Sequence, residues 1–347
     1  MNKSIVSLAL LAAFSGAASA QSNVTVYGKI DLGLVLDGGN AAGHSVRISS
    51  GVTGGSRLGF KGVEDLGGGI KAAFQLETGF CADSAAPVIS NGASTPNFCT
   101  GSNAFMGRQA HGDLTGPFGA MSAGRQYSLG YSNLTTIDPF GTGYAGQVNN
   151  IVDGSGTRVN NSFHYTTPGF GGVTASGEFA LGEQTGNWRK SRVTGASVNY
   201  AGGPAYAGLS FYDVENANGI DTARRNVLLG GTFDLAVVKL HALVQRSTGN
   251  PTGAAKLDTV DFMGGVTVPL VGGNLMASYV HHDDRGVLDR DAQQLGVGFN
   301  YPLSKRTAVY TAFARIKDSH GAPFTVGNAT ESGTGNKAFD LGVVHNF

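Results

Sequence analysis

Long apolar runs are missing from this sequence after residue 20. No stretch of about 18 consecutive apolar residues occurs in the remainder, which excludes a membrane-spanning helix because such a helix needs about 20 of them. Proline is scarce, with 10 residues in 347, and glycine follows no three-residue repeat, so a collagen-like chain is excluded too. An apolar content of 41% argues against intrinsic disorder.

Charge of either sign is sparse and balanced. Only 14% of the residues are charged, and 24 Lys and Arg offset 24 Asp and Glu for a formal net charge of +0. A basic surface that binds nucleic acid is therefore not expected. The sequence holds two cysteines, fewer than the ligands that a zinc site requires.

Catalytic motifs are missing as well. The sequence contains no GxSxG and no HExxH, and no nucleophile–base pair stands out. GTGYAG at 141–146 fits GxGxxG, but no strand and helix flank it as a dinucleotide site requires. His281 and His282 are neighbours on a predicted strand and point to opposite faces, so they cannot easily chelate one ion together. We therefore expect no enzyme activity, no metal and no cofactor.

The first 20 residues have the three parts of a secretory signal. Lys3 supplies a positive charge, residues 5–14 form an apolar core, and Ala18-Ser19-Ala20 matches the small-residue pattern of a cleavage site. We predict that residues 1–20 are a cleaved signal peptide and that residues 21–347 form the exported protein.

The exported part is rich in glycine and alternates with a period of two residues. In 24–36, Val26, Ile30 and Leu34 share one face, while Lys29 and Asp31 lie on the other. This period is typical of a β-strand with one apolar face. The same alternation recurs at 69–80, 158–167, 173–181, 258–268, 274–280 and 293–301.

Two kinds of connection separate these segments. Short ones rich in turn residues lie at 65–69, 115–119, 168–172, 201–204 and 271–274, and long polar ones lie at 81–102, 128–157 and 318–336. The pattern predicts an all-β fold: a transmembrane antiparallel β-barrel of about 16 strands, with short periplasmic turns and long extracellular loops, formed by residues 21–347 as one domain. A soluble β-sandwich or propeller also alternates, but no propeller-length repeat is present, and the mid-strand charges favour a watery lumen.

The last nine residues, FDLGVVHNF, form one further alternating strand that ends on Phe347. In a closed barrel the last strand pairs with the first, and an aromatic residue at its end lies at the membrane interface. The chain can therefore stop on an apolar side chain without exposing it to water.

Several segments resemble the trimeric general porins of beta-proteobacteria and Neisseria. They are VTVYGKIDLGL after the signal, SRLGFKGVEDLGGGIKAAFQLETGF at 56–80, GRQY at 124–127, RVNNSFHYTTPGFGG at 158–172 and the terminal Phe347, and the resemblance runs from Gln21 to Phe347. It implies sixteen strands, a homotrimer embedded in outer-membrane lipids, and a third long loop folded into the pore, the place that 128–157 occupies. It also implies that Phe347 is an assembly signal read by the barrel assembly machinery. The Cys-bounded second loop and the sequence of the inward loop depart from the family's commoner pattern.

Basic residues share the lumenal parity of the predicted strands. Arg57 and Lys61 lie on one face of a strand whose other face carries Leu58 and Phe60. By resemblance, Arg57, Arg108 and Arg158 fall at the positions of a basic constriction cluster. We add Arg125 from the intervening strand and, from the inward loop, Asp138 and Asp153 as acidic residues that could oppose it. The alternative is that each arginine only pairs with a nearby carboxylate or extends to the rim.

These features predict a passive diffusion channel for small hydrophilic solutes and ions in the outer membrane of a Gram-negative bacterium. The arginines favour anions, because net charge near zero leaves local placement as the only source of selectivity. Two alternatives stay open: a substrate-specific channel for phosphate or an organic acid, and a barrel whose long loops act in adhesion.

Cys81 and Cys99 are predicted to form an intrachain disulfide in the second extracellular loop. An exported chain meets an oxidising compartment, and the pair bounds the polar stretch CADSAAPVISNGASTPNFC. The 17 enclosed residues correspond to about 3 kcal/mol in the chain-entropy model. Reduction should loosen this loop without unfolding the barrel. Thiol titration of the native protein is the measurement, and two free thiols would exclude the bond.

Overall fold

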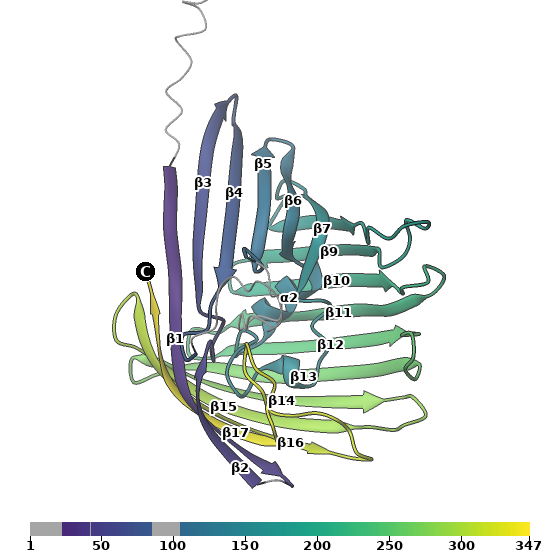
Figure 1. The fold of residues 1–347 in the computed structure, drawn as a ribbon. Coiled ribbons are helices and arrows are strands. Elements are labelled where there is room, and N and C mark those ends of the chain that lie inside the picture. The colour runs from purple at the N-terminus through teal and green to yellow at the C-terminus, as the bar shows by residue number, and fades with distance from the viewer. Residues whose placement is uncertain (1–22, 42, 85–104) are drawn as a thin grey trace, which may run out of the picture.

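The computed structural model describes residues 23–41, 43–84 and 105–347, and in it one antiparallel sheet closes on itself (Figure 1). The strands are β1 Asn23–Asn40, β2 Gly43–Ser50, β3 Arg57–Gly67, β4 Ile70–Gly79, β5 Gln109–Gly116, β6 Gly119–Tyr127, β7 Arg158–Thr166, β8 Val173–Ala180, β9 Val193–Gly202, β10 Ala205–Glu215, β11 Thr222–Asp234, β12 Lys239–Gly249, β13 Leu257–Leu270, β14 Gly273–Asp284, β15 Ala292–Pro302, β16 Thr307–Asp318 and β17 Lys337–Asn346.

The barrel has sixteen strand positions around its circumference, which we call staves. The seventeen strands fill sixteen staves because β2 and β3 occupy one of them in succession. The second half of β1 pairs with β2, from Leu32 opposite Ser50 to Asp37 opposite Ser45. Its first half pairs with β3, from Asn23 opposite Val63 to Lys29 opposite Arg57. Residues 51–56 interrupt this stave. The predicted antiparallel barrel of about 16 strands is confirmed.

The two faces of each strand follow the predicted alternation. On β17, Leu341 points outward and is 51% exposed, whereas its neighbour Asp340 points inward and is 1% exposed. The exposed apolar side chains of the other strands include Val26, Leu34, Leu229, Phe262, Leu295 and Phe313. Such an outward apolar band is what a barrel in a bilayer requires.

The two ends of the barrel differ. Tight connections join β3 to β4, β5 to β6, β9 to β10 and β13 to β14, and long ones follow β4, β6, β8 and β16. The connection between β1 and β2 at the loop end is short, unlike its counterparts. Cys81 lies two residues beyond β4, but Cys99 falls outside the described residues, so the disulfide stays a prediction.

The connection between β6 and β7 folds into the barrel. It contains α2 (Leu129–Ile137) and the short 3-10 helix η1 (Val148–Asn150), and α2 lies inside the ring of strands (Figure 1). We call residues 128–157 the inward loop. Ser128 caps α2, because its Oγ accepts a hydrogen bond from the Tyr131 N–H at 3.1 Å. Within the described residues, no helix is long and apolar enough to cross a membrane.

An apolar patch on the lumenal wall holds the inward loop. Leu134, Ile137 and Val148 of the loop are buried at 0–1% exposure. They belong to one core cluster with the inward-facing wall residues Leu228, Leu243, Met263, Val280, Ala312, Ala314 and Ile316. The predicted lumenal face was polar, so this apolar patch was not expected. The signal was apolar residues on both faces of β11 and β12, as in Val227-Leu228-Leu229.

Polar wall residues hold both ends of α2. The Glu178 carboxylate accepts the Leu129 N–H at 3.0 Å at the first turn. At the other end, His241 Nδ1 donates to the Ile137 carbonyl at 2.7 Å. The acid at the start complements the helix dipole, and the imidazole at the end satisfies a carbonyl of the last turn. The helix is thus fixed in position by β8 and β12 as well as by packing.

Further wall side chains bind the backbone of the inward loop beyond α2. The Asp340 carboxylate accepts the Ala145 N–H at 2.6 Å, and Gln294 Nε2 donates to the Gln147 carbonyl at 2.9 Å. Gln245 Nε2 donates to the Asp153 carbonyl at 2.9 Å. Because these bonds span β12 to β17, the loop is attached along its whole length.

Phe347 completes the closure of the barrel. Its backbone exchanges two hydrogen bonds with Gly28, of 3.1 and 3.0 Å. A Cβ on Gly28 would lie 2.2 Å from the Phe347 ring, so the ring occupies the space that the glycine leaves on the outer face of β1. The terminal aromatic therefore packs across the seam between the first and last strands.

We predict that Phe347→Ala lowers the amount of folded barrel in the membrane far more than Phe339→Ala. Both rings lie on the outer face of the last strand and the residue that follows it. Either substitution therefore removes a few kcal/mol of apolar contact. Both residues face β1 across the seam, but only Phe347 is the terminal residue and fills the space above Gly28. The measurement is the amount of folded, heat-modifiable protein in the outer membrane at equal expression. Equal accumulation of the two variants would contradict a role for Phe347 in assembly.

A second prediction concerns the attachment of the inward loop. Leu134→Ala with Ile137→Ala removes buried methyl groups, and each substitution costs about 2–5 kcal/mol. The loop should then leave the wall part of the time, and single-channel recordings should show larger conductance and more noise. The matched control is Ser132→Ala with Thr135→Ala on the lumen side of the same helix. If both pairs give the same conductance and noise, the patch does not hold the loop.

Candidate functional site

A cavity of about 730 Å³ lies between the inward loop and the β3–β7 wall, and four arginines line it: Arg57, Arg108, Arg125 and Arg158. Arg57 and Arg158 are the first residues of β3 and β7, and Arg125 lies in β6. Arg108 directly precedes β5 rather than lying within a strand. The cluster therefore gathers at one level, where successive staves begin or end.

One buried carboxylate organises two of these arginines. Arg108 Nε donates to Glu77 Oε1 at 2.5 Å, and Arg57 Nη1 lies 3.6 Å from the same oxygen. The Glu77 side chain is almost fully buried. The Tyr27 hydroxyl donates to its other oxygen at 3.0 Å. Glu77 therefore fixes the guanidinium groups and offsets one of the four positive charges, so the cluster as a whole stays positive.

Tyr127 joins Arg108 to Arg158. Its hydroxyl accepts one N–H from each guanidinium, both at 2.8 Å. The Arg158 guanidinium also lies over the Tyr127 ring, 4.6 Å from its centroid, and Arg158 Nε is buried with no hydrogen-bond partner among the described residues. Two like charges are thus held close together by a neutral group.

The hydrogen bonds of Arg125 within the described part of the chain go to neutral acceptors. Its Nε donates to the Gly107 carbonyl at 2.6 Å and its Nη1 to Asn160 Oδ1 at 2.5 Å. None of the cavity-lining residues in the described part of the chain is acidic. The loop side of the cavity carries hydroxyls and amides instead: Tyr131, Ser132, Thr135, Thr142, Gln147 and Asn149.

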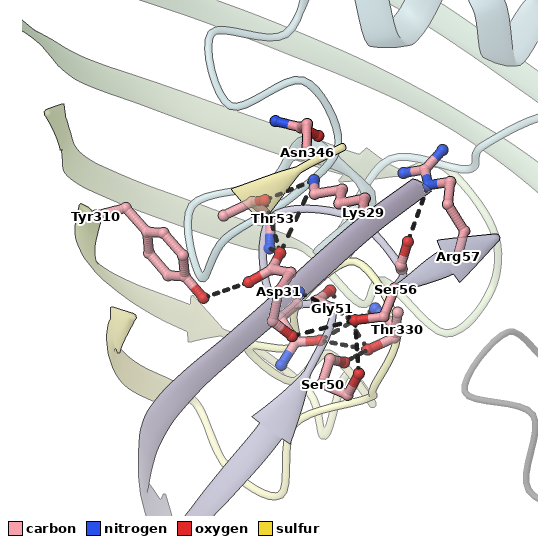
Figure 2. A network of polar contacts seen from close by, with 12 residues as sticks. Lys29, Asp31, Ser50, Gly51, Thr53, Ser56, Arg57, Tyr310, Thr330 and Asn346 are labelled. Carbon is pink, nitrogen blue, oxygen red and sulfur yellow. Dashed lines mark hydrogen bonds and ion pairs between the residues drawn. The ribbon is translucent and has the colours of Figure 1, made fainter. Parts of the chain in front are cut away.

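The interruption between β2 and β3 forms a further part of the cavity wall. The Asp31 carboxylate accepts both the backbone N–H and the hydroxyl of Thr53, each at 2.7 Å, and the Tyr310 hydroxyl at 2.7 Å. Lys29 Nζ donates to Thr53 Oγ1 at 2.8 Å (Figure 2). This network turns the segment into the lumen, where Thr53 and Gly54 line the cavity.

The inward loop docks on the same segment. The Tyr144 N–H donates to the Val52 carbonyl at 2.8 Å, and Val52 is fully buried. A Cβ on Gly143 would lie 2.4 Å from the Thr53 carbonyl oxygen, so a glycine is needed where the two backbones meet. The loop and the interrupted stave together set the width of the constriction.

Three of the predicted site residues lie away from this cavity. Lys61 lies over the Tyr27 ring, 5.3 Å from its centroid, and is not among the lining residues. Asp153 pairs with Arg224 at 2.8 Å beside a second cavity of about 710 Å³ on the other side of the inward loop. Asp138 is buried within the loop.

Asp138 organises the loop's own backbone. Its carboxylate accepts the N–H groups of Phe140, Thr142 and Val148 at 3.1, 2.9 and 3.2 Å. Burial raises the pKa of this carboxyl to about 6, and the three N–H groups limit the rise. In this arrangement neither Asp138 nor Asp153 faces the four arginines.

The residues that hold the arginines were not predicted from the sequence. Glu77 lies in the alternating segment 69–80 and Tyr127 lies in the quoted GRQY segment, but neither was given a role. Strand parity alone could have placed Glu77 in the lumen near Arg57, since the two strands are consecutive. No local pattern indicates that one tyrosine accepts from two arginines.

Comparisons with known proteins agree with this geometry. A family model described as Gram-negative porin matches residues 7–321. The chain is 33% identical to outer membrane porin protein 32 of Delftia acidovorans, with all of both chains covered, and 29% identical to an outer membrane porin protein of Bordetella pertussis, with 94% and 99% covered. A solved anion-selective porin from Comamonas acidovorans superposes with a TM-score of 0.76 at 28% identity, covering 94% of this chain and all of the other. The chain belongs to the Gram-negative porin family and is a channel protein of the bacterial outer membrane.

Proposed function

We propose that this porin is an anion-preferring passive channel whose selectivity resides in Arg57, Arg108, Arg125 and Arg158. The observation that carries the proposal is the composition of the constriction: four guanidinium groups line it and no carboxylate among the described residues does. The similarity to a solved porin described as anion-selective supports the same preference.

The size of the effect suits a channel rather than a binding protein. Two unit charges ~7 Å apart at an effective dielectric of ~20 interact by roughly 2 kcal/mol. A difference of about 1.4 kcal/mol is a tenfold bias, which sorts anions from cations without retaining them. Arginine stays protonated at any working pH, so the preference should not titrate near neutrality.

Salt should weaken the preference in a defined way. The Debye length falls from about 10 Å at 0.1 M to about 3 Å at 1 M. Arg57, Arg125 and Arg158 are partly exposed, whereas Arg108 is buried. A conductance that rises linearly with salt supports a general channel for small hydrophilic solutes and ions. Saturation at low phosphate or carboxylate would instead support a substrate-specific channel.

The remaining parts of the proposal concern assembly. We place cleavage of the signal after residue 20, insertion by the barrel assembly machinery through the strand that ends in Phe347, and association into a homotrimer in outer-membrane lipid. The channel performs no chemistry. A native mass matching one chain in mild detergent would argue against the trimer.

Removing two of the arginines should abolish most of the anion preference. Arg57→Ser with Arg158→Ser leaves Glu77 paired with Arg108, so the wall keeps its buried ion pair. We expect the permeability ratio of chloride to potassium to fall several-fold, since each lost charge removes roughly 1 kcal/mol or more at this spacing. The measurement is the reversal potential across a tenfold KCl gradient in planar bilayers.

The matched control is Lys305→Ser with Arg306→Ser, which removes the same charge from the exposed turn between β15 and β16. Its reversal potential should stay close to that of the native pore. Cation preference in the native pore, or equal shifts in both double variants, would show that the four arginines do not set the selectivity.

A further inference from the structure

The cavity beside the inward loop contains two kinds of polar group. The four arginines supply charge, whereas the hydroxyls of Tyr127 and Tyr131 supply neutral hydrogen bonds in defined directions. A Coulomb field sorts anions from cations, but it treats anions of equal charge and size alike. A directed donor in the same place separates such anions by how strongly each accepts a hydrogen bond.

The register of two strands places Tyr127 among the arginines. Tyr127 is the last residue of β6 and lies opposite Arg158, the first residue of β7. Two neighbours hold its ring: the Arg158 guanidinium lies 4.6 Å from the centroid, and the Tyr131 ring of α2 stacks on it at a centroid distance of 5.2 Å. The hydroxyl therefore has little freedom to turn away from the cluster.

The Tyr127 oxygen is an acceptor towards two arginines, and its own hydrogen is left over. Arg108 Nη2 and Arg158 Nη2 each donate to this oxygen at 2.8 Å. A guanidinium group has no acceptor atom, so the O–H hydrogen cannot be donated to either of them. Within the part of the chain that the structure describes, no other group accepts this hydrogen.

The neighbouring tyrosine hydroxyls differ in this respect, because each has a partner for its hydrogen. The Tyr27 hydroxyl donates to Glu77 at 3.0 Å, and the Tyr131 hydroxyl lies 2.9 Å from the Thr142 hydroxyl. Tyr127 lines the cavity, so its unused hydrogen is available to a solute in the lumen. The two charged N–H groups that it accepts also polarise the O–H bond and make it a stronger donor.

We propose that the Tyr127 hydroxyl is the hydrogen-bond donor that a permeating anion meets in the constriction. Through it the channel favours anions that are strong hydrogen-bond acceptors, such as carboxylates, over weak acceptors of the same charge. A donor at the constriction lowers the barrier for the anion that it binds, because the ion loses part of its hydration there. The inference rests on the proposed anion channel and adds to it a discrimination among anions.

Formate and nitrate make the test direct. Both are planar oxyanions of single charge and similar size, and formate is the stronger acceptor because it is the conjugate base of the weaker acid. Their permeability ratio is taken from the reversal potential in planar bilayers, with potassium formate on one side and potassium nitrate on the other. We expect the ratio of formate to nitrate to fall about threefold in Tyr127→Phe. A net hydrogen bond corresponds to about a fivefold effect, and nitrate loses part of the same bond.

Tyr206→Phe is the matched control. The Tyr206 hydroxyl donates to Asn133 of α2 at 2.8 Å, and neither residue lines the cavity. Its removal should leave the ratio of formate to nitrate at the native value. Phe keeps the ring that stacks on Tyr131 in the Tyr127 variant, so both proteins should fold and form channels.

The ratio of chloride to potassium is measured for the same proteins in a KCl gradient. If Tyr127 only held the arginines in place, Tyr127→Phe would lower this second ratio and leave the ratio of formate to nitrate unchanged. That result, or an equal fall in Tyr206→Phe, would overturn the inference and leave the proposed anion channel intact. Cation preference in the native pore would contradict the proposed function, and this inference with it.

Discussion

The whole structure depends on the pairing of β1 with β17. In hydrocarbon every backbone N–H and C=O must find a partner within the protein, so a sheet that spans a bilayer has to close. Ten residue pairs join the two strands, from Lys29 opposite Asn346 to Gly38 opposite Lys337, and Gly28 with Phe347 extends the ladder by one step. Closure separates the inner face of the sheet from the lipid. Because the protein has no net charge, only charges placed on this enclosed face can favour ions of one sign.

The lumen combines two requirements that conflict in a simple polar tube. Water and ions need polar walls, whereas a loop held across the lumen needs apolar contact. The barrel separates them by position: the β3–β7 wall carries the arginines, and the β11–β16 wall carries the apolar patch. The inward loop matches both, with Leu134 and Ile137 on one side and Ser132 and Thr135 on the other.

The direction of a side chain could be predicted from the sequence only where the residue lies in a strand. Parity placed Arg57 on the inner face because period-two alternation is strict within a strand. Asp138 and Asp153 lie in an irregular loop, where no period relates sequence to direction, and both point away from the arginines. The patch around Leu228 and Leu243 escaped notice for another reason: an inner face that binds a loop is apolar, and alternation cannot separate it from a strand buried on both sides. Partners such as Glu77 and Tyr127 depend on contacts between strands, which one sequence does not display.

The docking of the inward loop has a consequence for the order of folding. Ala145 binds Asp340 of the last strand, Tyr144 binds the Val52 carbonyl beside the second stave, and Tyr310 meets Asp31 of the first strand. The docking of the loop is therefore completed by contacts to the last strands, and the Tyr310–Asp31 contact forms only when the end of the chain meets β1. Contacts of such sequence separation form late. A barrel that stops folding before β1 pairs with β17 has its lumenal wall but not the fully docked inward loop. Ion selectivity is in this sense a property of the closed barrel, and it is completed at the last step of folding.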